Sequence, residues 1–246
     1  MNTLVSEVTS CLVPRAELAD TTHEEMFRLL ADHFTGVSRD QFERDLNKKN
    51  WVILLEREGA LTGFSTLAVY ETSFAGEPVS VVYSGDTIVS REGWGSTALS
   101  RTWIASVNEL RIQYPRGPYY WLLLTSGFRA YRFLPLFWRE FYPRFDAVTP
   151  VVAKKLIDHL VGEQFGWQYD GDRGIVRFER PQRLIRELAA VPEGRATNPH
   201  VAFFCARNPR HSEGDELVCL TELTEDNLTA AGRRMVGPGA AGSGTT

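Results

Sequence analysis

Hydrophobic and polar positions change their spacing several times along this chain, and each change predicts a new element. The first apolar stretch, residues 5–13, has the length of a strand. It stops at Pro14, which cannot donate a ladder hydrogen bond. Helical and strand-like spacings then follow one another, so the pattern predicts an α/β (α+β) fold.

Two amphipathic helices are expected before the next strand. The first has an apolar stripe at helical spacing, made by Met26, Phe27, Leu29, Leu30 and Phe34. Asp20, Thr21 or Thr22 can cap this helix. Ser38 and Gln41 form a capping-box pattern, which predicts a second helix through Phe42 and Leu46.

The middle of the chain has the pattern of a strand meander. Three stretches, 51–58, 61–71 and 78–90, are dense in β-branched and aromatic residues. Turns at Gly59 and Gly76 separate them. Three successive antiparallel strands are the expected result.

A helix, a strand and a second helix are expected next. Residues 97–114 place Leu99, Trp103, Val107 and Leu110 on one helical face. A short strand at 118–125 and a helix at 128–140 follow. Pro135 should kink or divide the latter helix, because proline removes a helical hydrogen bond.

The C-terminal half of the sequence predicts six elements after Pro150. They are a helix at 152–161, a strand at 174–178, a helix near Leu184, strands at 200–207 and 216–223, and a helix opened by Thr224. We therefore expect a core in residues 1–148, an insertion in 149–198, and strands with a helix that complete the sheet in 199–235. Residues 236–246 read as a flexible tail, because they are rich in glycine and poor in apolar groups.

Composition excludes several classes of protein. The net charge of −4 argues against a protein that coats nucleic acid. Cys11, Cys205 and Cys219 are widely spaced, and the five histidines form no HExxH pattern, so neither a disulfide framework nor a metal site is expected. The sequence predicts no secretory signal and no membrane span, which favours a cytoplasmic protein.

The segment DTIVSREGWGSTAL joins a strand to a helix, and together with the element order it resembles the GNAT superfamily of acyl-CoA N-acyltransferases. The family pattern is a strand, Q/R-x-x-G-x-G/A and a helix whose exposed N–H groups receive the CoA pyrophosphate. If Arg91 takes the first position, Trp94 replaces a glycine, whereas aligning Gly93 and Gly95 puts Ser90 first. The resemblance implies a donor site at Ile88, Val89, Ser90, Arg91, Gly93, Trp94, Gly95 and Ser96. Without a ligand, the same residues form a strand-to-helix turn in which serine caps the helix.

A second segment, WLLLTSGFRAYRFLPLFW, resembles the splayed strand and following helix of the same family. Pantetheine lies between the splayed strands there, and Ser126 falls in the region where members often have asparagine. The family often uses a tyrosine on the following helix to protonate the thiolate. Tyr131 is the preferred phenol here and Tyr142 the other, although an aromatic core contact is the usual role of such a residue.

Asp86 lies in the strand that leads to the loop, where GNAT enzymes often have a carboxylate that takes a proton from the attacking amine. Burial would raise its pKa towards that of a useful base. The alternative is an aspartate that faces solvent or pairs with an arginine. Asp86 and Tyr131 are thus the predicted catalytic residues.

The resemblance implies transfer of an acyl group from acyl-CoA, or from an acyl carrier protein thioester, to an amine. The acyl donor is a co-substrate, with no permanently bound cofactor and no metal. Four arginines, Arg129, Arg132, Arg139 and Arg144, could meet a carrier protein, a CoA phosphate or an acidic peptide, or form a solvated helix face. A homodimer is a further expectation. The alternative function is a GNAT-shaped module that binds a ligand or protein without catalysis.

Overall fold

The computed structural model describes residues 8–93 and 96–236. Trp94 and Gly95 of the predicted donor loop therefore lie outside the described residues, as does the tail from Gly237 onward.

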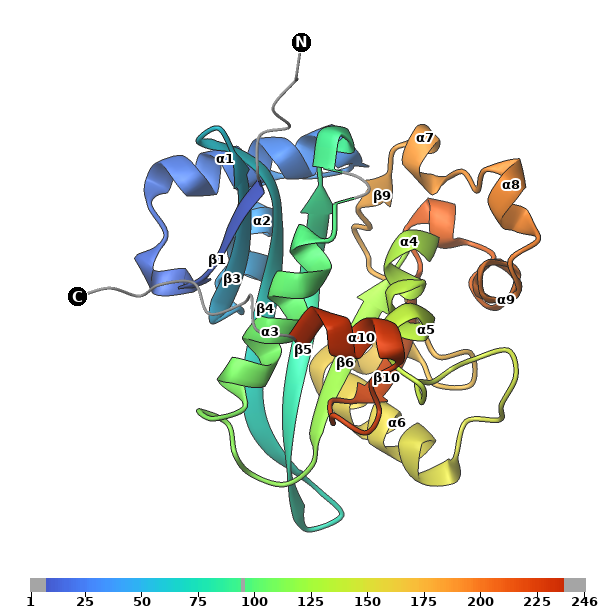
Figure 1. Cartoon of the computed structure of the whole chain (residues 1–246). Helices are drawn as coiled ribbons and strands as arrows, with labels where there is room; N and C mark the ends of the chain where they lie inside the picture. The colour runs from blue at the N-terminus through green and yellow to red at the C-terminus, as the bar shows by residue number, and fades with distance from the viewer. Residues whose placement is uncertain (1–7, 94–95, 237–246) are drawn as a thin grey trace.

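An eight-stranded sheet runs through the molecule (Figure 1). Its spatial order is β1 (Val8–Pro14), β3 (Trp51–Arg57), β4 (Ala60–Phe74), β5 (Glu77–Val89), β6 (Tyr119–Thr125), β10 (Glu216–Glu222), β8 (Ile175–Val176) and β7 (Tyr169–Asp170). Neighbours are antiparallel except β5 and β6, which are parallel. The expected mixed, mostly antiparallel sheet flanked by helices is therefore confirmed.

Helices cover both faces of this sheet, and the alternation of β4 separates the two layers. Leu67 and Val69 pack in the cluster of Trp103, on the first face, which α3 (Ala98–Leu110), α4 (Phe128–Tyr131) and α5 (Phe133–Phe137) cover. Phe64 points the other way, into the cluster of Met26. This second face is covered by α1 (Asp20–His33), α2 (Arg39–Leu46) and α6 (Val151–Phe165).

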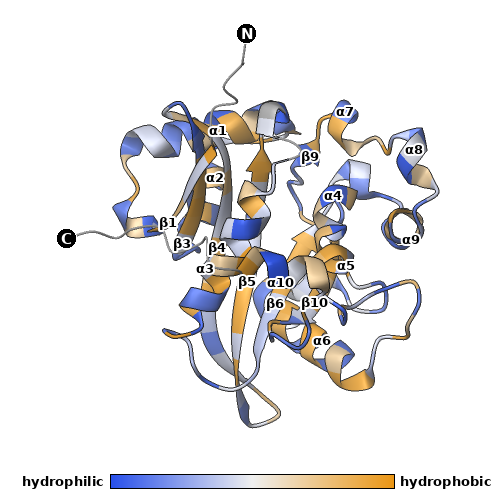
Figure 2. Cartoon of the chain, viewed as in Figure 1, coloured by the Kyte–Doolittle hydropathy of each residue, from blue (hydrophilic) through white to orange (hydrophobic). Residues whose placement is uncertain are grey.

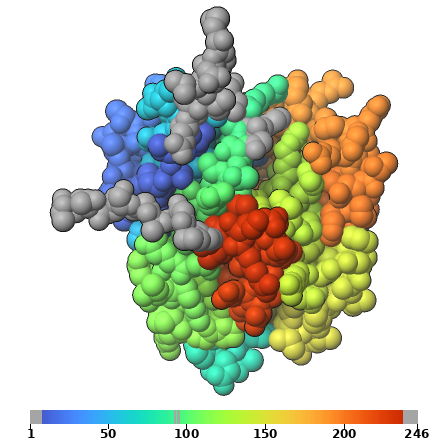
Figure 3. All heavy atoms as spheres, viewed as in Figure 1, coloured from blue at the N-terminus to red at the C-terminus, as the bar shows by residue number. Residues whose placement is uncertain are grey.

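The C-terminal helix α10 (Ala230–Val236) closes the first face. It packs against α3 and α5, and in the space-filling view it lies between the surfaces of these elements (Figure 3). Hydrophobic residues are concentrated on the central strands beneath the helices (Figure 2). The sheet is thus sealed on this side by residues distant in sequence.

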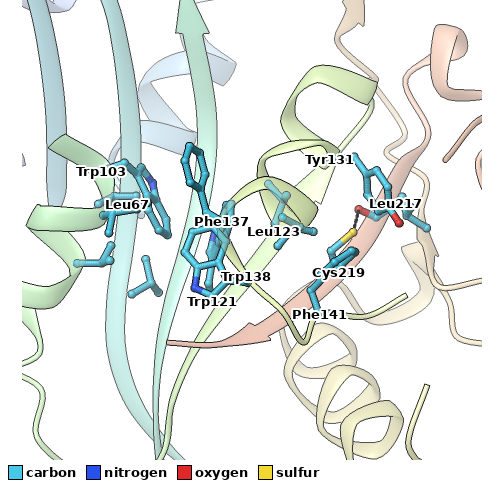
Figure 4. Packing of buried hydrophobic residues seen from close by; sticks show 14 of the residues in the cluster. Leu67, Trp103, Trp121, Leu123, Tyr131, Phe137, Trp138, Phe141, Leu217 and Cys219 are labelled. Atoms are coloured by element: carbon cyan, nitrogen blue, oxygen red, sulfur yellow. Dashed lines mark hydrogen bonds between the residues drawn. The ribbon is translucent and has the colours of Figure 1, made fainter. Parts of the chain in front are cut away.

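Most aromatic residues between 119 and 142 form the core on the first face. The rings of Trp103 and Trp121 lie 4.3 Å apart, and those of Trp121 and Trp138 lie 5.0 Å apart (Figure 4). All three side chains are almost fully buried. Packing accounts for these residues, as burial of large aromatic side chains is a major source of stability.

A second sheet, of two short strands, accompanies the main one. β2 (Phe34–Thr35) pairs with β9 (Arg183–Leu184), which is followed by α7 (Arg186–Ala189) and α8 (Glu193–Ala196). Two 3-10 helices matter for the site, η2 (Arg91–Gly93) and η4 (His211–Glu213); η1 (Arg15–Glu17) and η3 (Gly166–Gln168) lie elsewhere. The predicted insertion, 149–198, also supplies β7 and β8 to the main sheet.

The structure confirms most predicted elements and corrects three. The meander, the strand at 118–125 and the division of the helix at 128–140 are confirmed. The strand predicted at 200–207 is wrong, because α9 (Pro199–Arg207) occupies it and Asn198 caps that helix. α1 begins after Ala19 with no side-chain cap, so the predicted cap is also wrong. The last helix begins at Ala230, not at Thr224, whose hydroxyl instead accepts from the Asn227 N–H.

Candidate functional site

The parallel strands β5 and β6 separate towards their C-terminal ends. They pair from Ser80 with Tyr119 to Ser84 with Leu123, and residues 85–89 of β5 have no partner in β6. The Ser90 N–H donates to Thr62 O at 2.8 Å, so residues 88 and 90 direct their backbone groups to β4. The backbone of Thr87 therefore faces the β6 side. A wedge between two strands is the result.

A bulge marks the narrow end of this wedge. Ser65 of β4 pairs with Thr87 and Leu67 with Ser84, so Thr66 alone opposes Gly85 and Asp86. The extra residue in β5 interrupts the ladder and turns the following side chain. Thr66 Oγ1 is buried without a hydrogen-bond partner among the described residues. The bulge therefore places Gly85 against this unsatisfied atom, and Asp86 follows directly in the chain.

A polar cluster occupies the second face at this bulge. Its members are Lys49 from the turn after α2, Tyr83 and Asp86 from β5, and Glu216 from the start of β10. Lys49 is only 8% exposed, and its Nζ lies 4.5 Å from the centre of the Tyr83 ring. Glu216 and Asp86 are half-buried. Three elements distant in sequence thus bring two carboxylates and one ammonium group together.

The cluster shifts the protonation of its own members. Burial raises the pKa of Asp86 to about 6, and Lys49 opposes this shift. Burial, followed by the charge of Asp86, raises the pKa of Glu216 to about 8. Burial lowers the pKa of Lys49. Asp86 is therefore the carboxylate that ionises first, and Glu216 is the one that keeps its proton to higher pH.

The described residues of the predicted donor loop have different surroundings. Ile88 is buried against α1 and α2, so its side chain belongs to the core. Ser90 Oγ is buried without a partner among the described residues. Ser96 Oγ accepts from the Ala98 N–H at 3.1 Å, but it lies one residue before Thr97, the N-cap of α3, whose side chain makes no capping hydrogen bond. A Cβ at Gly93 would come within 2.6 Å of Val89 Cγ1, which explains the glycine.

Two arginines approach each other near this loop. Arg91 on η2 lowers the pKa of Arg129 on α4, after the larger effect of burial. Arg129 also donates to Leu188 O at 2.6 Å. Ser126, at the turn between β6 and α4, is buried, and a hydrogen bond with its backbone partly offsets the burial that lowers the pKa of His211. The wide end of the wedge is therefore flanked by positive charge.

The predicted acid, Tyr131, lies in the core. It is fully buried beside Phe141, and its hydroxyl donates to Pro143 O at 3.0 Å. Figure 4 shows it next to Leu217 and Cys219 of β10. Burial raises the pKa of its phenol well above the usual range. This placement favours packing over proton donation.

Sequence reasoning missed Lys49 and Glu216. Neither residue stands in a motif, and the only signals were a lysine before a buried strand and a glutamate at a strand start. Tyr83 was also missed; it is a phenol on the face of Asp86, and its pKa is raised first by burial and then by Glu216 and Asp86. Within residues 8–93 and 96–236, no group of three or more histidine, cysteine or carboxylate side chains could hold a metal ion. No helix there is both long and apolar enough to cross a membrane.

Comparison with known proteins gives structural neighbours only. No protein-family model matches the sequence, and no curated protein does. A probable N-acyltransferase from Enterococcus faecalis V583 shares 17% identity and a TM-score of 0.41, over 50% of this chain and 31% of that one. The GNAT family N-acetyltransferase YhbS from Escherichia coli, solved with CoA, shares 13% identity and a TM-score of 0.37, over 52% and 68%. Glucosamine-6-phosphate N-acetyltransferase from Arabidopsis thaliana shares 10% identity and a TM-score of 0.33, over 46% and 81%.

Proposed function

We propose that this protein is an acyltransferase that moves an acyl group from an acyl thioester to an amine. The observation that carries the proposal is the wedge between β5 and β6, with the half-buried Asp86 at its narrow end. A thioester in the wedge can lie along unpaired strand backbone. An ionised carboxylate beside it can then receive the proton of an attacking amine.

The reaction follows from the roles of the cluster. The amine nitrogen attacks the thioester carbonyl carbon, and its proton passes to Asp86 directly or through a water. A strand N–H near Val89 stabilises the negative charge that develops on the carbonyl oxygen. The C–S bond then breaks, and Glu216, whose pKa is raised by burial and by Asp86, is a candidate donor of the proton to the thiolate. Holding the two reactants together accounts for a large share of the expected rate.

The donor enters from the wide end of the wedge. Arg91 and Arg129 lie there, and Ser90 Oγ supplies a buried polar atom. Guanidinium groups bind phosphates through strong, directed hydrogen bonds. Acyl-CoA is therefore the preferred co-substrate, and an acyl carrier protein thioester the second. Neither is held permanently.

The proposal is tested by a transfer assay with the full chain. Acyl-CoA of several chain lengths is mixed with a panel of primary amines, and both the free thiol and the mass of the amide are measured. We expect thiol release that requires an amine and gives an equal amount of amide. Thiol release without amide would indicate hydrolysis and contradict the proposal.

The second candidate is a module that binds a ligand without catalysis, and the core position of Tyr131 favours it. A thermal-shift series with CoA and acyl-CoA tests donor binding, and the transfer assay then separates the two functions. Both predict a higher melting temperature with a bound donor, because a ligand of the folded state stabilises it. Only the enzyme also forms amide.

A further inference from the structure

A pocket of about 470 Å³ lies beside the wide end of the wedge, separate from the polar cluster at Asp86. Leu184, Ile185, Ala189 and Val191 supply much of its apolar lining, and Thr35 and His211 lie at its sides. Its volume falls in the range of small-molecule sites, about 300–1,000 Å³. The polar cluster described above contributes no residue to this lining.

The wall of the pocket is anchored on both sides. β9 pairs with β2, and the Ile185 N–H donates to His33 O at 3.0 Å. On the other side, Arg129 on α4 holds the Leu188 carbonyl. Leu184 Cδ1 would lie 3.4 Å from a Cβ at Gly127, directly after β6. The pocket is therefore built into the fold, and it adjoins the end of β6.

The polar groups of the lining select for an anion. Arg183 and Arg186 are exposed at the pocket, and no acidic side chain is among the described residues that line it. Glu187 and Glu193 stand in the same segment but outside the lining. His211 also lines the pocket, and it has a hydrogen bond with the Ser126 backbone at the end of β6.

We propose that this pocket binds a fatty-acid-type carboxylate, with its chain on the apolar wall and its carboxylate at Arg183 and Arg186. The chain replaces water on Leu184, Ile185 and Val191, and the hydrophobic effect supplies most of the affinity. The arginines add charge-assisted hydrogen bonds and exclude cationic amphiphiles. This site does not depend on acyl transfer, since its occupant needs neither a thioester nor an amine.

Calorimetric titration of the full chain with decanoate tests the site, with decanol and decylamine as ligands of matched length. We expect binding in the order decanoate, decanol, decylamine. Ala190→Trp, at an exposed lining position, should weaken decanoate binding at least tenfold by filling the pocket. The double variant Arg183→Gln and Arg186→Gln should weaken decanoate roughly three- to tenfold, because exposed ion pairs are individually weak, and should leave decanol unchanged.

Arg195→Gln is the matched control, an exposed arginine of α8 outside the lining, and it should bind decanoate normally. An unchanged melting temperature establishes that each variant is folded. Absence of decanoate binding in the wild type would overturn the proposal. Equal binding of decylamine, or equal binding by Ala190→Trp, would do the same. Because these titrations contain no acyl donor, their outcome does not bear on the transferase proposal.

Discussion

Gly85 of β5 packs directly against the side chain of Lys49. A Cβ at Gly85 would come within 2.6 Å of Lys49 Cε and 2.8 Å of Thr66 Oγ1. The absence of a side chain at the bulge therefore lets a buried lysine reach the centre of the second face. That contact ties the position of the only ammonium group in the described cluster to a single glycine.

Gly85→Ala should push Lys49 away from Asp86 and move the acidic limb of the transfer rate to higher pH. Lys49 favours the ionised form of Asp86, so its withdrawal raises a pKa that is already about 6. The lysine stem is flexible, so we expect the fold to survive with a stability loss of about 1–3 kcal/mol. The pH dependence of kcat/KM and a thermal melt check both effects.

Lys49→Met removes the positive charge with a side chain of similar length. It should also move the acidic limb of the transfer rate to higher pH. Gly162→Ala is the matched glycine control, because nothing lies within 4 Å of a Cβ there and Gly162 is in the α6 helix. It should leave the limb in place and slightly stabilise the helix. If the acidic limb of the pH profile moves in neither Gly85→Ala nor Lys49→Met, Lys49 has no influence on the pKa of Asp86.

Asp86→Asn should lower the rate of transfer roughly 10²–10⁴-fold, the range of a positioned proton acceptor. The amide keeps the shape of the side chain but cannot take the proton, so donor affinity should be unchanged. The acidic limb near pH 6 should also disappear. Steady-state kinetics across pH measure the rate, and calorimetry with CoA measures the affinity.

Asp40→Asn, at an exposed position of α2, is the control for the removal of one carboxylate. It should leave the rate and the limb unchanged. Full activity of Asp86→Asn would remove Asp86 from the mechanism. A fall in donor affinity in that variant would instead assign Asp86 to the shape of the wedge.

Local pattern was sufficient to predict the meander and the divided helix. β3, β4 and β5 have strong strand residues with glycine turns between them, and Pro135 cannot donate to the Tyr131 carbonyl, where α4 ends. The strand prediction for residues 200–207 was wrong because valine and phenylalanine, here Val201, Phe203 and Phe204, are also common in strands. The stronger signal was Asn198 followed by Pro199, a cap and first-turn pair that predicts a helix.

The site could be predicted only where a motif contained it. Asp86 is predicted from the sequence because it precedes a recognisable strand-to-helix loop. Lys49 precedes β3, which reaches β5 through β4, and Glu216 begins β10, which reaches β5 through β6. Those long-range contacts follow from tertiary structure, which local spacing does not encode. The pocket beside β9 depends in the same way on the pairing of β9 with β2.

Tyr131→Phe should leave the transfer rate within about twofold and lower the stability by about 1–3 kcal/mol. The carbonyl of the half-buried Pro143 loses the donor that now lies 3.0 Å away, and the loss of a hydrogen bond of this kind costs about that much. Kinetics and thermal melts of the variant measure the two quantities. A hundredfold loss of rate at normal donor affinity would restore Tyr131 as the acid.

Glu216→Gln should flatten the dependence of stability on pH. The folded state raises the pKa of Glu216 from its ordinary 4.5 to about 8, so the fold holds this proton more tightly than the unfolded chain does. The contribution of the residue is therefore most favourable below about pH 4.5, and it is lost progressively as the pH rises to about 8. Glutamine has no proton to lose, so the variant should be the more stable protein at pH 8.5.

The size of this effect is limited because Glu216 is half-buried and solvent screens its charge. A gain of about 1 kcal/mol at pH 8.5 corresponds to a rise of about 2–4 °C in melting temperature for a chain of this length. Melts of wild type and variant at pH 5.5 and 8.5 measure the difference. Glu222→Gln, at the exposed far end of β10, should retain the wild-type slope. If Glu216→Gln and wild type lose equal stability between the two pH values, Glu216 is ionised at neutral pH and cannot supply the proton to the thiolate.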